Sequence, residues 1–306
     1  MQSLKILITA GASPAAFNII KHLKSLGHYV VAADANEKAL PLVRTMADKI
    51  VKVPFVNQTE YMPFMTEQIQ TVDLVIPFID EEIAQLIKHL DTGMWQKCLL
   101  PERNTTEICL FKNKFQTFCK DNDLPIAPDV SVSKKLPAVF KPNLGRGGKG
   151  VEIINNLALL DDKSSDNGII QEFIKGEEFT IDALFSKNGQ LIIISARRRD
   201  TSSGVSVIGT IVDPEPFFPI VEQISKVLKF RYLINIQIIK DDQDRLHIIE
   251  INPRIAGSIM FTVYSGFDFL KAAMNTFIGN KVNFLNKQKK IRIIRYWNEH
   301  VEDLST

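Results

Sequence analysis

The 306-residue sequence has few cysteines, no long apolar run and no excess of charge of either sign. Its three cysteines, Cys98, Cys109 and Cys119, lack Cys-x-x-Cys spacing, so neither a disulfide framework nor a zinc site is indicated. The longest apolar-rich runs, such as residues 232–239, are far shorter than the ~18 residues of a membrane-spanning helix. With 37 Lys and Arg against 35 Asp and Glu, the chain is too evenly charged for a protein that mainly binds nucleic acid.

The remaining composition is typical of a globular protein. Apolar residues make up 45% and charged residues 24%, which excludes a disordered or coiled-coil chain. The first residues lack the length and cleavage site of a signal peptide, so we expect a cytoplasmic protein with no membrane partner. At roughly 150 residues per domain the length predicts about two domains, and a homodimer is the default oligomer.

Strand-like and helical patterns alternate over the first hundred residues. The predicted strands cover residues 4–10, 28–34 and 72–78. Apolar side chains recur at helical spacing in residues 14–27 and 80–91. This alternation predicts a Rossmann-like domain with a parallel sheet and helices on its faces.

The turn after the first strand resembles a dinucleotide-binding loop only in its position. It contains Gly11, and Asp34 ends the second predicted strand. The dinucleotide fingerprint needs three spaced glycines, whereas residues 11–17 contain one. We therefore interpret this turn as structural. A nicotinamide-dependent oxidoreductase is a minor alternative that titration with NADH would test.

The pattern changes after Pro101. Residues 105–121 predict one helix with a Thr cap, and short β-rich segments from residue 138 onward predict antiparallel strands. The basic residues 287–297 are interpreted as a solvated edge strand rather than a nucleic-acid contact.

A second glycine cluster follows a predicted strand that contains Lys141. Glycines at 145, 147, 148 and 150 alternate with Arg146 and Lys149. Glycines let backbone N–H groups converge on an anion, and the cations neutralise the charge of a triphosphate. Lys149 precedes a glycine rather than Ser or Thr, so the loop is not a Walker A motif. A basic hairpin turn without a ligand is the alternative.

Residues 235–254 predict an antiparallel hairpin with one polar face. Glu250 and Asn252 are two residues apart and share a face. If the turn is centred on residues 242 and 243, Gln237 stands opposite Ile248 and diagonal to Glu250. The oxygens of these side chains suit Mg²⁺. An ordinary amphipathic hairpin with its polar side in water is equally compatible.

The other face of this hairpin is expected to be apolar and to face the core, with Ile236, Ile238, Ile249 and Ile251 on it. Arg254 follows the hairpin, where a guanidinium would neutralise an anionic acyl or phosphoryl group.

Three arginines lie on another predicted strand, in the run SARRRDTSSGVSVIG. Alternation places Arg197 and Arg199 on one face and Arg198 on the other. Arg199 is the preferred candidate for binding a substrate carboxylate bidentately. A solvated basic strand end is the alternative.

Taken together, the segments FKPNLGRGGKGV, QEFIKGEEFTID and IIEINPRIAGS resemble the ATP-grasp superfamily, in particular the branch that looks like the large subunit of carbamoyl-phosphate synthase. GASPAAF and IPFIDEE are similar to the leading domain of that family, which as a rule binds no nucleotide. The resemblance implies an α/β and α+β fold. A Rossmann-like domain at 1–104 would precede an ATP-grasp fold of two α+β subdomains, 105–176 with the glycine loop and 177–306 with the metal hairpin.

The resemblance also implies a role for each matching residue. The ATP phosphates would be contacted by Lys112, Lys141 and the loop glycines Gly147 and Gly148. The adenine would be contacted by Glu172, Phe173 and Ile174, and the ribose by Glu178. One or two Mg²⁺ or Mn²⁺ ions would be bound by Gln237, Glu250 and Asn252, and the catalytic residues would be Arg254 and Arg199. Phe111 departs from the family, which often has an acid before this lysine.

The implied function is an ATP-dependent ligase that joins a small-molecule carboxylate to an amine or thiol through an acylphosphate. The chain contains no glutaminase segment, so complete carbamoyl-phosphate synthesis is not expected. A non-catalytic ATP-binding regulatory or accessory subunit is the alternative.

Overall fold

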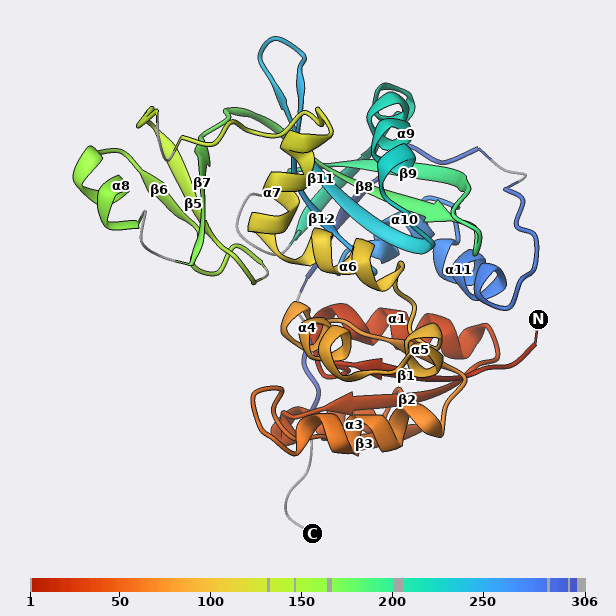
Figure 1. The fold of residues 1–306 in the computed structure, drawn as a ribbon. Helices are drawn as coiled ribbons and strands as arrows, with labels where there is room; N and C mark the ends of the chain where they lie inside the picture. The colour runs from red at the N-terminus through yellow and green to blue at the C-terminus, as the bar shows by residue number, and fades with distance from the viewer. Residues whose placement is uncertain are drawn as a thin grey trace.

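The computed structural model describes residues 2–130, 133–145, 147–163, 167–200, 206–284, 287–296 and 298–301. Figure 1 shows the described elements arranged around three sheets. The N-terminal domain lies beneath a large central sheet, and a small third sheet projects to one side. This confirms the mixed α/β fold class expected from the sequence.

The N-terminal domain contains a parallel sheet in the order β3-β2-β1-β4. Its strands are β1 (Lys5–Thr9), β2 (Tyr29–Asp34), β3 (Lys49–Lys52) and β4 (Leu74–Ile76). Its helices are α1 (Pro14–Ser25), η1 (Glu37–Ala39), α2 (Leu40–Arg44), α3 (Tyr61–Gln70), α4 (Asp80–His89) and α5 (Thr92–Gln96). Strand β3 was not predicted because it is short, has a lysine at each end and contains no fully buried residue.

The helix predicted over residues 105–121 is wrong as a single element. The chain forms α6 (Arg103–Leu110) and α7 (Lys112–Asp121), and Phe111 between them is extended, with φ −95° and ψ 115°. No side-chain cap precedes α6, so the expected Thr cap is wrong as well. The N–H of Lys112 donates instead to the carbonyl of Asn143 at 3.0 Å, which ties the start of α7 to the strand that carries Lys141.

The central sheet is antiparallel, with six strands in the order β12-β11-β8-β9-β10-β13. They are β8 (Gly176–Phe185), β9 (Leu191–Arg199), β10 (Ile208–Val212), β11 (Tyr232–Asp241), β12 (Leu246–Asn252) and β13 (Arg292–Ile294). The helical segments of this part are η2 (Glu215–Phe217), α9 (Phe218–Val227), α10 (Ile259–Tyr264) and α11 (Phe269–Phe277). Strand β13 pairs with β10 at the sheet edge, as expected for the basic C-terminal segment.

One face of the central sheet is apolar and packs against α6, α7 and α9. Phe179, Ile181 and Ile236 of the sheet share one buried core with Phe115 of α7 and Ile224 of α9. The resemblance grouped α6 and α7 with the glycine-loop subdomain, whereas Cys109, Phe115 and Cys119 pack in the core of the central sheet. We therefore propose that the subdomain boundary lies near residue 128 rather than 105.

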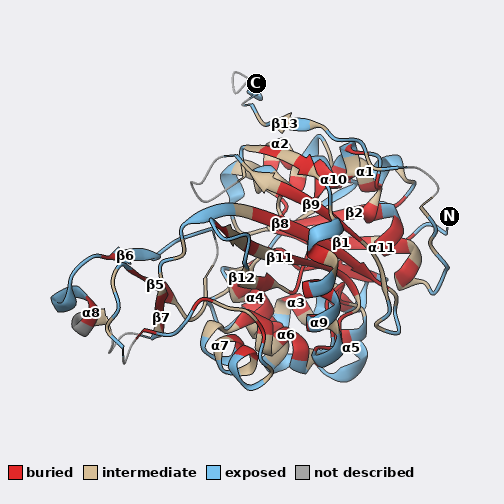
Figure 2. Cartoon of the chain, turned by 90° about the horizontal axis from the view of Figure 1, so that it is seen from above, coloured by how far each residue is buried: buried red, intermediate tan, exposed pale blue. Residues whose placement is uncertain are grey.

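The third sheet is small and has its own core. It contains β5 (Ala138–Pro142), β6 (Glu152–Ile154) and β7 (Gly168–Glu172), in the order β6-β5-β7, with α8 (Leu157–Lys163) beside it. Its core is built around Phe140 and Leu160 and shares no buried residue with the other cores. Figures 1 and 2 both show this sheet standing apart from the rest of the molecule.

The N-terminal domain and the far end of the central sheet share one buried core. Ile6 and Ile20 pack in the same cluster as Leu184, Leu233 and Phe269. This joint core fixes the C-terminal edge of the parallel sheet against the loop that follows β12. No described helix is both long and apolar enough to cross a bilayer.

Candidate active site

A polar patch covers the second face of the central sheet, opposite the α6, α7 and α9 side. The strand registers place Glu178 and Thr180 of β8, Arg199 of β9, and Gln237 and Glu250 of β11 and β12 on this one face. The β5–β6 turn of the small third sheet completes a cleft of about 230 Å³ with Glu178, Arg199, Gln237 and Glu250.

The three predicted metal ligands lie together, although not in the register expected. A bulge between Gln237 and Ile238 places Gln237 directly opposite Glu250 rather than diagonal to it. The Nε2 of Gln237 donates to Oε1 of Glu250 at 2.7 Å, and Nδ2 of Asn252 donates to the same oxygen at 3.0 Å. The bulge also turns Ile249 into the cleft, so the expectation that it faces the core is wrong.

Two arginines hold the amide oxygens of this group. Arg199 Nη1 donates to Oε1 of Gln237 at 3.3 Å, and Arg254 Nη2 donates to Oδ1 of Asn252 at 3.3 Å. As a result the amide NH₂ groups of Gln237 and Asn252 point toward Glu250. The second carboxylate oxygen of Glu250, Oε2, lies 3.8 Å from Nζ of Lys112. The carboxylate is thus oriented by neutral donors on one side and faces a cation on the other.

Arg199 also forms an ion pair with Glu178, through its Nη1 and Oε1. Both residues line the cleft, and the Arg199 side chain is only 9% exposed. The residue proposed to bind ribose therefore already has a cationic partner. The Arg199 guanidinium therefore lies beside the predicted metal ligand Gln237, and its expected contact with a substrate carboxylate stays a prediction.

The two predicted phosphate-binding lysines meet at the cleft from different elements. Lys141 on β5 is almost fully buried and donates to Oε1 of Gln171 at 2.9 Å. Burial lowers the pKa of Lys141 to about 8, while the charges of Glu250 and Glu178 oppose this shift and that of Lys112 adds to it. Lys112 begins α7, and its Nζ donates to the carbonyl of Gly145 at 3.3 Å. The break in the predicted helix is what brings Lys112 here.

The glycine cluster forms the β5–β6 turn and lines the cleft, with Arg146 outside the described residues. Gly147 and Gly148 have φ of 63° and 73°, in the left-handed region that favours glycine. A Cβ atom at either position would meet nothing within 4 Å. The turn therefore presents its backbone to open space beside Lys112 and Lys141, as an anion-binding loop requires.

The segment predicted to contact adenine connects β7 to β8, and so joins the small sheet to the central sheet. The N–H groups of Glu172 and Phe173 donate to the carbonyls of Pro128 and Pro137, at 2.8 and 3.1 Å. The side chain of Glu172 bonds Lys135 at 2.5 Å. None of the three predicted residues lines the cleft, so their contact with adenine stays a prediction.

Arg254 lies behind the metal hairpin, at the contact with the N-terminal domain. Its Nε donates to Oδ1 of Asp80 at 2.7 Å, and both side chains are buried. Asp80 is the first residue of α4, 174 positions earlier in the chain, so sequence spacing gave no signal for this pair. The segment IPFIDEE was recognised, but only as part of the leading domain.

The first glycine turn is closed, in agreement with its structural interpretation. Oδ2 of Asp34 accepts from the N–H of Ala12 at 2.8 Å, and Oδ1 accepts from that of Asn36 at 2.7 Å. A Cβ atom on Gly11 would lie 2.9 Å from that of Ala32. The carboxylate of Asp34 thus accepts hydrogen bonds from the backbone of the turn, and no space is left beside Gly11.

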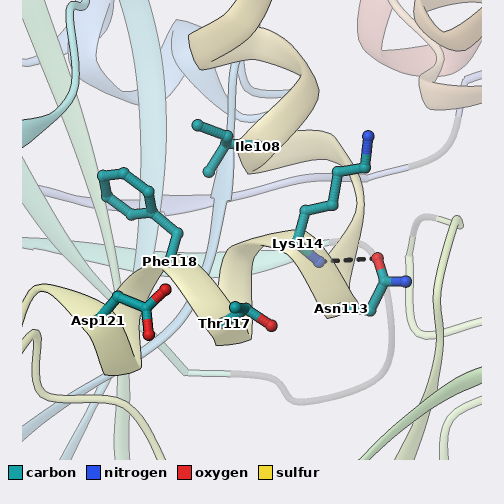
Figure 3. A pocket seen from close by; sticks show the side chains of 6 residues that line it. All are labelled: Ile108, Asn113, Lys114, Thr117, Phe118 and Asp121. Atoms are coloured by element: carbon teal, nitrogen blue, oxygen red, sulfur yellow. Dashed lines mark hydrogen bonds between the residues drawn. The ribbon is translucent and has the colours of Figure 1, made fainter.

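Another hollow, of about 390 Å³, lies where α6 meets α7 (Figure 3). It is lined by Ile108, Asn113, Lys114, Thr117, Phe118 and Asp121. Figure 3 shows Asn113 accepting from the backbone N–H of Lys114, and the Lys114 side chain pairs with Glu107. None of the predicted site residues lines it, so we place the functional site in the cleft on the central sheet.

Two family models match the chain in succession. A "PylC-like, N-terminal domain" covers residues 6–96, and "ATP-grasp in the biosynthetic pathway with Ter operon" covers residues 164–299. The chain carries an ATP-grasp domain behind a PylC-like N-terminal domain. The ATP-grasp prediction is confirmed, while the particular likeness to carbamoyl-phosphate synthase stays a resemblance.

Solved structures share this ATP-grasp architecture. The biotin carboxylase domain of 2-oxoglutarate carboxylase from Hydrogenobacter thermophilus, crystallised with MgADP, ADP and bicarbonate, is 16% identical with a TM-score of 0.74, covering 93% of this chain and 72% of that chain. N5-carboxyaminoimidazole ribonucleotide synthetase from Thermotoga maritima is 17% identical with a TM-score of 0.72, and the match covers 92% of this chain and 78% of that chain. An L-amino acid ligase from Bacillus licheniformis is 18% identical with a TM-score of 0.67, and the match covers 90% of this chain and 75% of that chain. At these identities the likeness establishes the fold.

Proposed function

We propose that this protein is an ATP- and Mg²⁺-dependent ligase that activates a carboxylate as an acylphosphate and transfers the acyl group to an amine or thiol. The observation that carries the proposal is the cleft itself. It joins an open glycine turn, Lys112, Lys141 and the carboxylate of Glu250 within one cavity. Cations and N–H donors on one wall, with an acid on the other, are what a metal–triphosphate complex needs.

In this proposal the nucleotide lies between the small sheet and the central sheet. Lys112, Lys141 and the turn at Gly147 and Gly148 bind its phosphates. The N–H groups of Glu172 and Phe173 are already bonded, so we assign the adenine-facing donor to Ile174. Glu178 binds the ribose hydroxyls once Arg199 turns from it toward the phosphates.

The donor set fits Mg²⁺, provided that the nucleotide completes it. Glu250 supplies the charge, and Gln237 and Asn252 supply amide oxygens, all hard ligands. The amide groups present NH₂ to Glu250 in the current arrangement, so half-turns of both amides are needed to bring their oxygens inward. Within the described residues no three His, Cys, Asp or Glu side chains gather at one point, so one or two ions here would depend on phosphate oxygens. Bound Mg²⁺ supplies charge neutralisation at the transferred phosphoryl group.

The chain's own contribution is to position the reactants and neutralise charge. An oxygen of the substrate carboxylate attacks the γ-phosphorus and ADP leaves; the amine nitrogen then attacks the acyl carbon, phosphate leaves, and the nitrogen loses a proton. Lys112 and Lys141 neutralise the phosphates through the first step. Arg254 is held by Asp80 behind the hairpin and bonds the amide oxygen of Asn252, so we assign it the role of positioning this metal ligand beside the reacting phosphoryl group.

Release of ADP in mixtures of carboxylates and amines tests the proposal. We expect turnover that needs both Mg²⁺ and an acid, and loss of that turnover in Glu250→Gln. Saturable ATP binding without turnover in any mixture would instead favour a non-catalytic ATP-binding accessory subunit. Light scattering of the purified protein would measure the homodimer expected by default.

A further inference from the structure

Three arginines from separate elements hold the loop that follows the metal hairpin, residues 254–258. Arg254 belongs to the loop and bonds Asn252 and the carbonyl of Ile255. Arg197 on β9 donates to Oγ of Ser258 at 2.6 and 3.1 Å. Arg295, directly after β13, donates through Nη2 to the carbonyl of Gly257 at 2.5 Å.

Two of these arginines have a carboxylate partner. Arg197 pairs with Asp182 at 2.5 and 3.2 Å, and both side chains are fully buried. Arg254 pairs with Asp80 at 2.7 Å. Each of these positive charges is therefore balanced inside the protein.

Arg295 pairs with no carboxylate among the residues that the structure describes. Its guanidinium stacks over the ring of Phe261, with 5.0 Å to the centroid, and bonds the Gly257 carbonyl. Burial and the nearby charge of Arg197 lower the pKa of Arg295. One hydrogen bond leaves most of its five N–H donors available for another acceptor.

The sheet register places Arg295 on the side of the candidate active site. Its backbone N–H donates to Val207, and its neighbour Ile293 pairs with Gly209, which in turn pairs with Arg199. Because faces alternate along a strand, Arg295 and Arg199 share one face. Gly209 between them has no side chain, and a Cβ atom there would lie 3.0 Å from the Phe261 ring.

We propose that Arg295 binds a carboxylate that the reaction does not consume, so that one of the two substrates carries a second anionic group. The inference rests on the proposed ligase function and narrows its substrate class. A guanidinium without a counter-ion in a half-buried position gains more from a carboxylate than an exposed one does, since less solvent screens the pair. The second carboxylate comes either from the acid being activated or from an amino acid that acts as the nucleophile.

Calorimetric binding of matched pairs of compounds tests the proposal, in the presence of Mg²⁺ and a non-hydrolysable ATP analogue. The probes are C4–C6 dicarboxylic acids with their monoamides, and α-amino acids with their amides. We expect Arg295→Gln to weaken binding of a carboxylate-bearing probe roughly ten- to hundredfold, as for loss of a charge-assisted hydrogen bond, and to leave its amide counterpart unchanged. Arg295→Lys should recover part of the affinity.

Arg292→Gln is the matched control, because it removes the same charge three residues earlier, at an exposed position of β13. If Arg295→Gln loses affinity only for the dicarboxylic acids, the second carboxylate belongs to the acid that is activated. If it loses affinity only for the amino acids, the second carboxylate belongs to the nucleophile. Equal effects of the two glutamine variants, equal losses for the amides, or no probe bound by the wild-type chain would each overturn the proposal. If the probes bind in an Arg295-dependent way but no mixture releases ADP, the ligase function is contradicted and the carboxylate site stands. If ADP is released at the same rate in Arg295→Gln as in the wild type, the carboxylate site is contradicted and the ligase function stands.

Discussion

The glycine turn after β1 and the glycine turn after β5 differ in whether other groups of the protein already fill them. At Gly11 the turn packs against Ala32, and Asp34 takes up the N–H of Ala12. At Gly147 and Gly148 a side chain would meet nothing within 4 Å, and two lysines stand beside the turn.

The difference shows that glycine content alone does not identify an anion-binding turn. Such a turn needs N–H groups not bonded within the protein, space in front of them and positive charge nearby. The first turn has a carboxylate within hydrogen-bonding distance, whereas Glu250, which lines the same cleft as the second turn, accepts hydrogen bonds from neutral amides. In the first case the acid completes the turn, and in the second it is available to a cation.

Replacing the acid opposite the open turn is expected to have the largest effect. Glu250→Gln removes the only charged member of the proposed metal ligands, so we expect turnover to fall by about 10²–10³, as when one preorganised electrostatic group is lost. The melting temperature should change little, because Glu250 is partly exposed and its amide partners remain. Steady-state ADP release at saturating Mg²⁺ measures the effect.

Asp244→Asn serves as the control for Glu250→Gln, since Asp244 lies in the exposed turn of the same hairpin, away from the cleft. Activity in this variant should equal that of the wild type. Unchanged turnover in Glu250→Gln would contradict the assignment of the metal face.

The lysine beside the open turn predicts a pH dependence. With a pKa of about 8, Lys141 is charged below pH 8 and loses its charge as the pH rises above it. The dissociation constant of an ATP analogue should therefore rise above pH 8, by up to about tenfold per pH unit when a single proton is linked to binding. Calorimetry from pH 6.5 to 9.5 checks this. Lys141→Arg stays charged over this range, so a rise in that variant as steep as in the wild type would exclude Lys141 as the source.

Alanine at each turn distinguishes an open loop from a packed one. Gly148→Ala places a Cβ in the left-handed region at a cost of about 1–2 kcal/mol. If the exposed turn relaxes in the free protein and returns to this conformation on binding, the cost falls on ATP affinity, so we expect about five- to tenfold weaker binding with little change in melting temperature. Gly11→Ala should do the reverse, destabilising the fold by about 1–3 kcal/mol through its contact with Ala32 and leaving ATP affinity unchanged. Thermal unfolding and ATP titration of both variants give the comparison; two identical profiles would contradict it.

Periodicity and motif order predicted most elements and the composition of the cleft. The strands carrying Lys141, Gln237 and Glu250 were predicted because apolar alternation is a local property. The bulge at Ile249 shifted the hairpin register, since bulges depend on backbone pairing that one strand's pattern does not show. The extended Phe111 was missed because its neighbours have helical composition on both sides.

Contacts between distant segments were beyond sequence reasoning. Asp80 meets Arg254, and Arg295 reaches Gly257, only because the N-terminal domain and the last strand pack around the loop after β12. Asp80 and Arg295 were not singled out in the sequence, and Arg254 was predicted to contact an anionic substrate group rather than Asp80. Only the packing of three separate elements determines which charges face one another.

The acid of the closed turn gives the smallest expected effect and tests the comparison from its other side. Asp34→Asn keeps a carbonyl oxygen for one of the two N–H donors but removes the charge, so the free energy of unfolding should fall by about 1–2 kcal/mol. Turnover and ATP affinity should stay within twofold of the wild type, because the turn is already closed by Asp34 and does not line the cleft. Urea unfolding and ADP release measure the two quantities. Saturable NADH binding by the wild-type chain that disappears in Asp34→Asn would show that the closed turn opens for a ligand, and would remove the contrast between the two loops.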